Sequence, residues 1–300
     1  MAMRQMRDGG ENRTAWLVML VTPLFFSSNL IFGRWTVPEV APATLAFVRW
    51  GIVALVLLPF ALRVRGAEVP WARVGLLGFL GMVVCGGIVY LALQVTTATN
   101  ATLIYTSSPV FVLLIERLRG VPLTARKALG CAVAMIGIAV ILFRGSLEAL
   151  AAFRLNWGDA LILACAIAWA FYSIVFRDER LGSLPAAAVF GLVAGLGALQ
   201  LLPFSVAEWA AGQPMPTTAR AWVGIAGIVV SASLIAFGGY QFGLRHLGAQ
   251  RTSVFMYLLP VYGVLLAVTF LGEAFRPFHA VGIVLVLGGV VLATRPSASS

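Results

Sequence analysis

Arg49 is a positively charged residue inside a long apolar stretch of this 300-residue sequence. A guanidinium in such surroundings costs roughly 2.5 to 3.5 kcal/mol to bury, and it usually faces a cavity or a partner. Its paired N–H donors match the two oxygens of a carboxylate. Two interpretations stay open. Arg49 contacts the carboxylate of a small molecule, or it ties helix ends together, for example by pairing with Glu39.

Aromatic rings and small polar groups gather on other apolar stretches. Residues three or four apart share one face of a helix, and this spacing places Tyr172 and Ser173 one turn after Trp169. Rings with one polar atom suit a flat or amphipathic solute better than an ion. The alternative is that the rings pack between helices or lie at a membrane interface. The candidate binding residues are Asn29, Arg49, Tyr90, Tyr105, Ser107, Ser108, Trp169, Tyr172, Ser173, Tyr240 and Tyr257.

Patterns typical of enzymes and metal sites are missing from the sequence. His246 and His279 lie near the ends of different apolar stretches, on opposite sides, and cannot share a metal ion. The three cysteines stand inside apolar stretches, where thiols behave as small hydrophobic groups. No nucleophile is paired with a base, and no phosphate-binding loop is visible. We therefore expect no cofactor, no metal and no enzymatic activity.

The composition places these residues in a membrane. Hydrophobic residues make up 61% of the chain and charged residues 11%, which a soluble globule of this size could not bury. The first stretch resembles a signal peptide, but it lacks a small-residue cleavage pattern, so we expect it to be retained. A helix needs about 20 apolar residues to cross a bilayer. Ten such stretches are predicted, at 15–33, 43–62, 74–94, 99–116, 126–143, 158–176, 185–207, 221–244, 251–271 and 277–294.

The first five stretches recur in the last five. Pro109 matches Pro260 at an offset of 151, and Gly130 matches Gly282 at an offset of 152. Because five is odd, the second copy must enter the membrane in the opposite direction, as in transporters whose substrate site lies between inverted halves. The predicted fold is an all-α polytopic membrane protein with ten transmembrane helices in two inverted five-helix repeats. The repeats cover 15–144 and 156–295, with cytoplasmic tails at 1–14 and 296–300.

Positive charge is unevenly distributed between the loops. Fifteen of the 21 Lys and Arg residues fall on one side of the predicted helices and five on the other, with Arg49 inside. Cytoplasmic loops are enriched in these residues, so both termini are expected in the cytoplasm. This asymmetry also accounts for the net charge of +10, which therefore does not indicate a nucleic-acid partner.

Two prolines stand near the middle of predicted helices, Pro109 in the fourth and Pro260 in the ninth. Proline removes a backbone hydrogen bond and bends a helix, which is tolerated in a membrane beside protein or a cavity. We expect both prolines to act as hinges beside the binding cavity. The alternative is that they only fix the geometry of a packed bundle.

Several segments resemble one transporter family. The run from Ala43 to Arg49, the two proline-containing helices, and the run from Gly272-Glu273 to Gly289 are similar to the drug/metabolite transporter superfamily, specifically its EamA-type ten-helix members. Within it the chain resembles bacterial amino-acid exporters of the YddG type. The resemblance implies an inner-membrane carrier with a central cavity that exports small metabolites. The Gly-Glu pair occurs only in the second half, because the first half has Arg119-Gly120-Val121 at that place.

These observations predict a secondary transporter, expected to be a monomer, that exports aromatic or hydrophobic amino acids with broad tolerance. Its expected partners are the small-molecule substrate and membrane lipid. The acidic residues all fall near helix ends or in loops, so coupling to protons or sodium is not expected. The alternatives are a multidrug carrier, a nucleotide-sugar or sugar-phosphate carrier, which should need several buried cations, and a channel-like or structural membrane subunit.

Overall fold

The computed structural model describes the backbone of residues 2–36, 38–64, 67–92, 94–271 and 274–294. The side chains of residues 2–12, 30–31, 33–35, 98–99, 267 and 270–271 lie outside this description. Gly272, Glu273 and the predicted tail at 296–300 also lie outside it.

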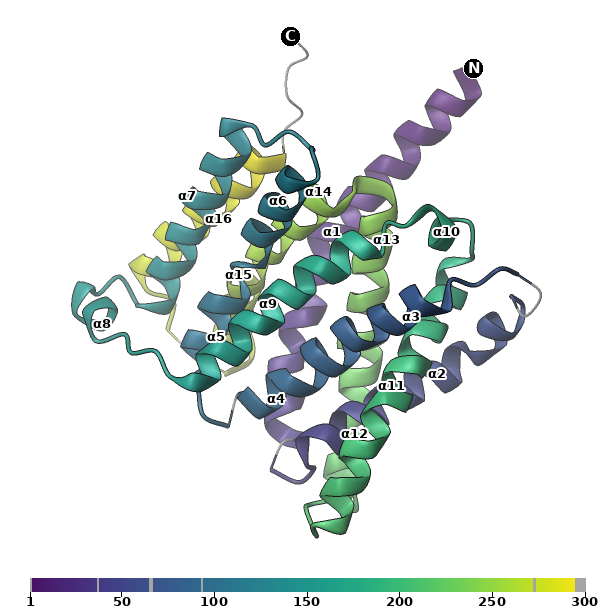
Figure 1. Cartoon of the computed structure of the whole chain (residues 1–300). Helices are drawn as coiled ribbons and strands as arrows, with labels where there is room; N and C mark the ends of the chain where they lie inside the picture. Colours follow the sequence, from purple (N-terminus) through teal and green to yellow (C-terminus); the bar gives the residue numbers. More distant parts are fainter. Residues whose placement is uncertain (1, 37, 65–66, 93, 272–273, 295–300) are drawn as a thin grey trace.

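Every regular element in these ranges is a helix (Figure 1). The order is α1 (Ala2–Thr36), α2 (Pro42–Leu62), α3 (Trp71–Gly78), η1 (Phe79–Ile88), α4 (Val89–Ala92), α5 (Ala98–Tyr105), α6 (Ser108–Leu118), α7 (Ala125–Leu142), α8 (Leu147–Ala151), α9 (Trp157–Val175), α10 (Glu179–Gly182), α11 (Ala186–Ala210), α12 (Ala219–Gly227), η2 (Ile228–Phe237), α13 (Gly238–Leu247), α14 (Ala249–Val254), η3 (Phe255–Leu258), α15 (Leu259–Leu271) and α16 (Pro277–Thr294).

Eight helical stretches of the described chain are long and apolar enough to cross a membrane. They match the predicted second to eighth and tenth spans. The predicted first span lies within α1, and the predicted ninth corresponds to α14, η3 and α15, where the last α-helical piece has 13 residues. The chain is therefore a multi-pass helical membrane protein. The ten-crossing inverted repeat stays a prediction.

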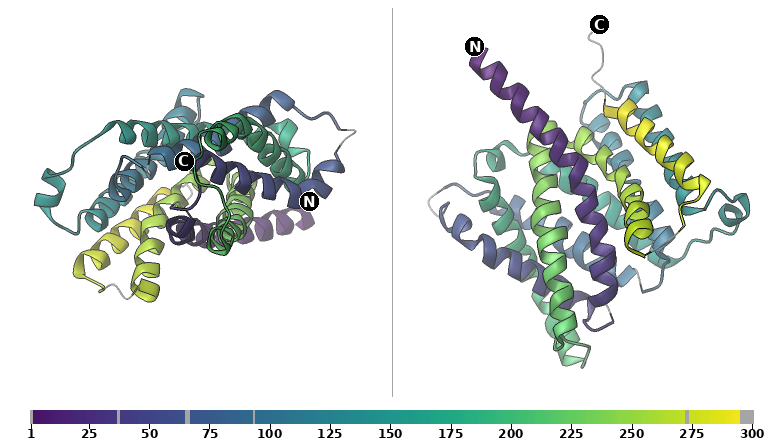
Figure 2. Two further views of the ribbon diagram at one scale, coloured as in Figure 1. Left: turned by 90° about the horizontal axis from the view of Figure 1, so that it is seen from below. Right: turned by 180° about the vertical axis from the view of Figure 1, so that it is seen from behind.

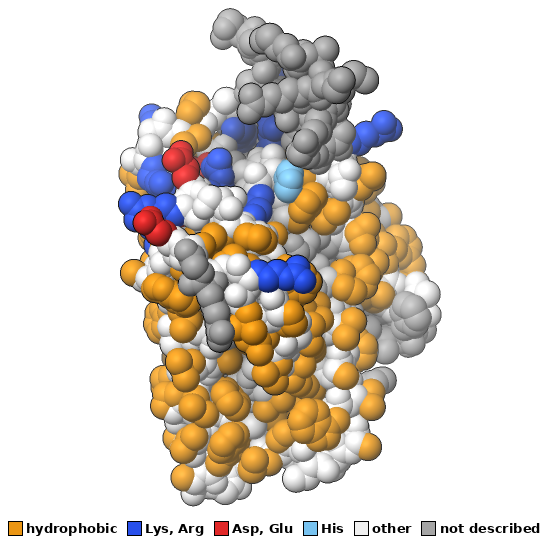
Figure 3. Space-filling model, turned by 90° about the vertical axis from the view of Figure 1, so that its right-hand side faces the viewer, with side chains coloured by type: hydrophobic (Ala, Val, Ile, Leu, Met, Phe, Trp, Pro, Cys, Tyr) orange, Lys and Arg blue, Asp and Glu red, His pale blue; other side chains and the backbone are white. Residues whose placement is uncertain are grey.

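The outside of the bundle suits lipid. Large apolar side chains such as Leu55, Leu163 and Val284 are exposed along the helices. Figure 3 shows one such side, where hydrophobic side chains cover most of the height and charged groups gather toward the upper end. That end is also where α1 begins and α16 ends (Figures 1 and 2). We call it the terminal end.

Helices at equivalent places in the two halves pack against each other. α7 crosses α16 in antiparallel sense at four glycines. A Cβ added to Gly137 would lie 2.7 Å from the carbonyl oxygen of Gly282, and one added to Gly130 would lie 2.7 Å from that of Gly289. Small residues allow this close approach in lipid. In the sequence, Gly130 matches Gly282 and Gly137 matches Gly289, whereas in the structure Gly130 contacts Gly289 and Gly137 contacts Gly282. A two-fold axis between inverted copies would produce this exchanged pattern of contacts.

Two long helices, Trp71–Ala92 and Ala219–Leu247, each contain a wider, π-helical segment at matching positions. η1 and η2 are ten-residue π-helical segments, and their starts, Phe79 and Ile228, differ by 149 positions. This equals the offset between matching residues of the third and eighth predicted spans. π-Helical turns inside α-helices are rare and occur frequently at functional sites. They direct attention to the side chains that η1 and η2 present to the interior.

The fourth and ninth predicted spans are interrupted just before their prolines. α5 ends at Tyr105 and α6 begins at Ser108, so Pro109 lies in the first turn of α6. In the second half, the 3-10 segment η3 precedes α15, in which Pro260 is the second residue. Both prolines thus stand directly after a break, where the missing N–H costs little. Their role as hinges stays a prediction.

Replacing Pro109 and Pro260 together by Ala should slow transport, because alanine favours continuous helices and stiffens both breaks. We expect a reduction of about two- to fivefold in the transport rate in proteoliposomes. Pro203→Ala, in a long uninterrupted helix, is the control and should leave the rate unchanged. Wild-type rates for the double variant would remove the hinge role.

Candidate functional site

Arg49 is buried in α2, with 5% of its surface exposed. Its Nε donates to the Ser233 hydroxyl on η2 at 2.6 Å, and its Nη1 donates to the Tyr90 hydroxyl on α4 at 3.1 Å. The guanidinium also lies 4.5 Å from the centre of the Trp50 ring, within cation–π distance. The contact with Ser233 connects the first half of the chain to the second.

No carboxylate pairs with Arg49 among the described residues. The alternative partner Glu39 instead accepts a hydrogen bond from Thr218 and lies 3.5 Å from Nε of Arg220. The indole N–H of Trp50, next to Arg49 in sequence, is also buried without a hydrogen-bond partner in this part of the chain. A buried cation with only neutral partners remains able to bind an anion.

An aromatic cluster surrounds Trp169 of α9. The Trp169 ring lies 4.7 Å from Tyr240 and 5.4 Å from Tyr172, between centroids, and is nearly parallel to Tyr172. Phe26 of α1 and Tyr105 of α5 approach the same indole at 6.0 and 6.3 Å. Four helices therefore contribute rings to one centre.

Phe237, the last residue of η2, joins this cluster to the Arg49 region. Its ring lies 5.1 Å from Trp169 and 5.0 Å from Trp50. Ser233, which accepts from Arg49, stands one turn earlier on the same segment. The cation and the aromatic cluster thus form one continuous site, and η2 carries the residues that join them.

Hydroxyl and amide groups provide polar atoms within the cluster. Ser173 donates to the carbonyl oxygen of Trp169, so its 2.8 Å contact with Tyr240 is one in which the Tyr240 hydroxyl donates. The Gln241 amide donates to the Tyr172 hydroxyl at 2.7 Å. These hydroxyl and amide groups are therefore held by neighbours, whereas the buried indole N–H of Trp169 has no hydrogen-bond partner among the described residues.

The other predicted residues, Asn29, Ser107, Ser108 and Tyr257, differ in their hydrogen bonding and surroundings. Asn29 and Ser108 each have a buried side-chain oxygen without a hydrogen-bond partner among the described residues, whereas Ser107 donates to the carbonyl oxygen of Ile104. Tyr257 lies beside Cys131 of α7, and the described rings of the cluster do not contact it. The Tyr257 hydroxyl is also buried without a hydrogen-bond partner in the described chain, so its role in binding stays a prediction.

Sequence reasoning missed Ser233 and Phe237. A signal was present, because Ser233, Phe237 and Gln241 follow at intervals of four residues and Tyr240 extends the same face. That face carries both hydroxyls and rings. The sequence did not indicate that this face contacts Arg49, because it did not predict the π-helical geometry of η2.

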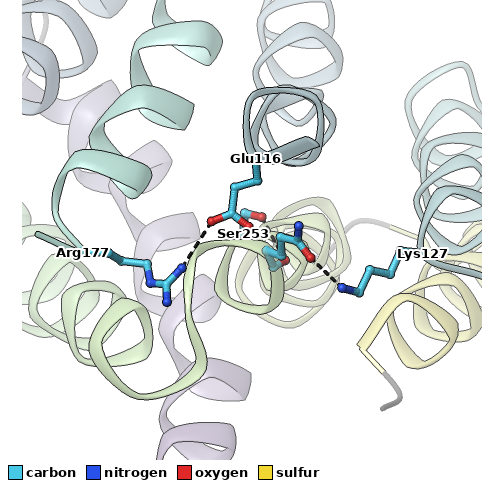
Figure 4. A network of polar contacts seen from close by, with 5 residues as sticks. Glu116, Lys127, Arg177 and Ser253 are labelled. Carbon is cyan, nitrogen blue, oxygen red and sulfur yellow. Dashed lines mark hydrogen bonds and ion pairs between the residues drawn. The ribbon is translucent and has the colours of Figure 1, made fainter. Parts of the chain in front are cut away.

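Polar contacts close the molecule around this site at the terminal end. Glu116 of α6 is buried, and its Oε1 lies 3.3 Å from Nη1 of Arg177, just after α9 (Figure 4). Arg73 pairs with Asp178 beside it. Lys127 of α7 donates to the Gln250 side chain of α14 at 2.6 Å (Figure 4). All three contacts link the first half of the chain to the second.

The opposite end is closed in a similar manner. Glu208, at the end of α11, accepts hydrogen bonds from the backbone N–H groups of Ala43 and Thr44 at 2.9 and 2.7 Å. The buried carboxylate of Asp159 accepts from Thr96 and from the Asn100 amide. Polar contacts thus join the halves at both ends, and the candidate residues are packed between them.

Removing the charge of Glu116 should loosen the terminal end. In Glu116→Gln the attraction to Arg177 is lost, but Arg177 is 47% exposed and partly screened, so we expect a cost of about 1 kcal/mol. The melting temperature in detergent should fall by a few degrees, measured by tryptophan fluorescence. Arg117→Gln, an exposed neighbour on the same helix, should leave it unchanged, and an equal shift in both variants would contradict the role of the pair.

Two of the grooves on the described surface are lined by none of the candidate binding residues. One, of about 560 Å³, lies at the terminal end among Arg73, Leu76, Ile115, Arg119, Phe171, Ile174, Val175, Arg177 and Asp178. The other, of about 670 Å³, lies among Thr97, Asn100 and residues of the segment from Leu142 to Asn156.

The helical bundle and its buried cationic and aromatic site define a multi-pass membrane protein with a polar centre. A model of the EamA-like transporter family matches the chain twice, over residues 13–143 and 156–295. The chain belongs to the EamA-like transporter family and is a membrane transporter.

Two relatives are distant in sequence but cover more than nine tenths of this chain. An uncharacterized transporter of Archaeoglobus fulgidus is 25% identical over 94% of this chain and 98% of its own length. The uncharacterized inner membrane transporter YedA of Escherichia coli K12 is 27% identical over 91% of this chain and 90% of its own. One crystal structure has a TM-score of 0.75 at 23% identity, covering 94% of this chain and 96% of its own, and supports the fold alone.

Proposed function

We propose that this transporter exports amino acids with aromatic or other apolar side chains. The observation that carries the proposal is Arg49, a buried cation without a carboxylate partner in the described chain, joined through Phe237 to the cluster around Trp169. The guanidinium matches an α-carboxylate, and the ring faces match an apolar side chain. An α-amino group next to that carboxylate can donate to a hydroxyl beside Arg49, such as that of Tyr90.

The proposal includes an architecture and an orientation. We propose two inverted five-helix repeats, which the exchanged glycine contacts of α7 and α16 support. The terminal end faces the cytoplasm, because fifteen Lys and Arg residues fall on the side predicted to be cytoplasmic. The inner membrane is the proposed location, since the relative YedA is named an inner membrane transporter.

Counterflow in proteoliposomes tests the substrate. Vesicles that contain the purified protein and a high concentration of unlabelled phenylalanine should accumulate external labelled phenylalanine transiently, and leucine and tryptophan should compete. Protein-free vesicles are the control. Saturable exchange of a nucleotide sugar or a lipophilic cation, without competition by any amino acid, would replace this proposal by one of the other carrier classes. Unsaturable flux would indicate a channel.

Transport should not be concentrative. The buried carboxylates Glu116 and Asp159 are held by polar partners toward the two ends of the molecule, and the described residues around Arg49 include none. Proton- and sodium-coupled carriers usually keep a carboxylate in the middle of the membrane. An imposed proton or sodium gradient should leave the steady-state amino-acid distribution unchanged. Accumulation above equilibrium, measured with labelled substrate in proteoliposomes, would contradict uncoupled transport.

A further inference from the structure

The groove at the terminal end combines an apolar wall with arginine side chains. Leu76 of α3 and Phe171 of α9 are 43% and 44% exposed, as expected for side chains that face lipid, and Ile115 of α6 also lines the groove. Arg73, Arg119 and Arg177 line the same groove. α9 runs between α3 and α6 on the side of the bundle that faces the viewer in Figure 1.

The charges of the groove do not cancel. Arg73 pairs with Asp178, and Arg177 pairs with the buried Glu116. Arg119 lines the groove, is exposed, and has no carboxylate partner among the described residues. With both ion pairs formed, one positive charge remains, which matches the single negative charge of a phosphodiester.

We propose that this groove binds an anionic phospholipid. The phosphodiester headgroup pairs with Arg119 and contacts the outer N–H groups of Arg73 and Arg177. An acyl chain lies along Leu76 and Phe171. Arginine-lined pockets at the cytoplasmic side of transmembrane helices bind such headgroups, and the flexible arginine side chains reach the interface while their methylene groups stay apolar. The assignment to the inner leaflet rests on the proposed orientation, but the site itself does not require the proposed substrate.

Lipid in this groove bears on the contacts that close the terminal end. Arg177 takes part both in the groove and in the ion pair with Glu116, and Arg73 and Asp178 lie beside it. A headgroup at Arg119 therefore adds a negative charge next to two ion pairs that link the halves of the chain. The lipid should stabilise the folded protein, which gives a measurement independent of transport.

The test is a titration of the purified full-length protein in a mild nonionic detergent. The melting temperature is followed by tryptophan fluorescence while phosphatidylglycerol or phosphatidylcholine is added, and native mass spectrometry counts the lipids that stay bound. We expect phosphatidylglycerol, and not phosphatidylcholine, to stabilise the protein in a saturable manner. Arg119→Gln should weaken the apparent affinity about fivefold, equivalent to about 1 kcal/mol for one arginine near a lipid surface.

Arg117→Gln is the matched control. Arg117 is exposed on the last turn of the same helix but does not line the groove, so the affinity for phosphatidylglycerol should not change. Equal binding of the two lipids, equal losses in the two variants, or competition by millimolar inorganic phosphate would each overturn the proposal. The last result would show a site for a free anion. Loss of amino-acid counterflow without loss of lipid binding would concern the proposed function alone.

Discussion

Replacing Arg49 by Gln is expected to lower the specificity constant for amino-acid transport about 10- to 100-fold. Arg49 is a buried cation next to the aromatic cluster, and in the proposed site it binds the substrate carboxylate. Hydrogen bonds to charged groups contribute about 1.5 to 3 kcal/mol each, which corresponds to this loss. The glutamine amide keeps a donor for Ser233 but cannot form the charged pair with a carboxylate. Initial rates of counterflow over a range of substrate concentrations measure the effect.

Stability separates binding from a structural role at this position. A guanidinium buried without a carboxylate is costly, so Arg49→Gln should leave the melting temperature unchanged or raise it. Arg49→Lys keeps the charge without the two-pronged geometry, and it should restore part of the transport that glutamine loses. A large loss of stability with normal transport by the folded fraction would show that Arg49 serves to hold the helices together.

Replacing Trp169 by Ala is expected to abolish most transport and to destabilise the protein by about 3 to 5 kcal/mol. The side chain is 2% exposed and contacts rings from four other helical segments, so its removal leaves a cavity at the centre of the cluster. Thermal unfolding in detergent gives the stability, and counterflow gives the activity.

Two further variants make this result specific. Trp169→Phe retains a ring, and we expect it to recover most of the stability and part of the transport. Trp157→Ala removes a tryptophan that is 60% exposed at the start of the same helix and should change neither quantity. Full transport by a folded Trp169→Ala variant would exclude the cluster from the substrate path.

Much of the fold could be predicted because the membrane limits the possibilities. Eight predicted spans correspond to helices of suitable length and hydropathy, since in lipid every backbone polar group must be bonded within the segment. The interruptions were less accessible. A proline indicated one at Pro109 and at Pro260, but the π-helical segments η1 and η2 have ordinary apolar sequences. Their geometry depends on neighbouring helices, such as the one that brings Arg49 to Ser233.

The candidate site was predicted as a set of residue types and less well as an arrangement. Spacing within one helix placed Trp169, Tyr172 and Ser173 together, because an α-helix fixes which residues share a face. Whether Arg49 had a carboxylate partner was open, since the crossing of α2 and η2 is not encoded in either segment alone. Tyr257 was predicted as one of the candidate binding residues, and the structure places it beside Cys131, apart from the rings of the cluster.

The π-helical segment η2 bears on how a bundle with contacts at both ends can still move. α12, η2 and α13 form one continuous helix. Arg220 near its start is held by Glu39, and Arg245 near its end donates to the Leu184 carbonyl oxygen at 2.9 Å. A π-helical turn contains about one residue more than an α-helical turn, so it shifts the hydrogen-bond register of the helix by one residue. When such a π-helical turn moves along the helix by one turn, the side chains between its old and new positions rotate about the helix axis by roughly 100°, the angle per residue. A migration of this kind along η2 would turn Phe237 away from Trp169 without moving the contacts of Arg220 and Arg245.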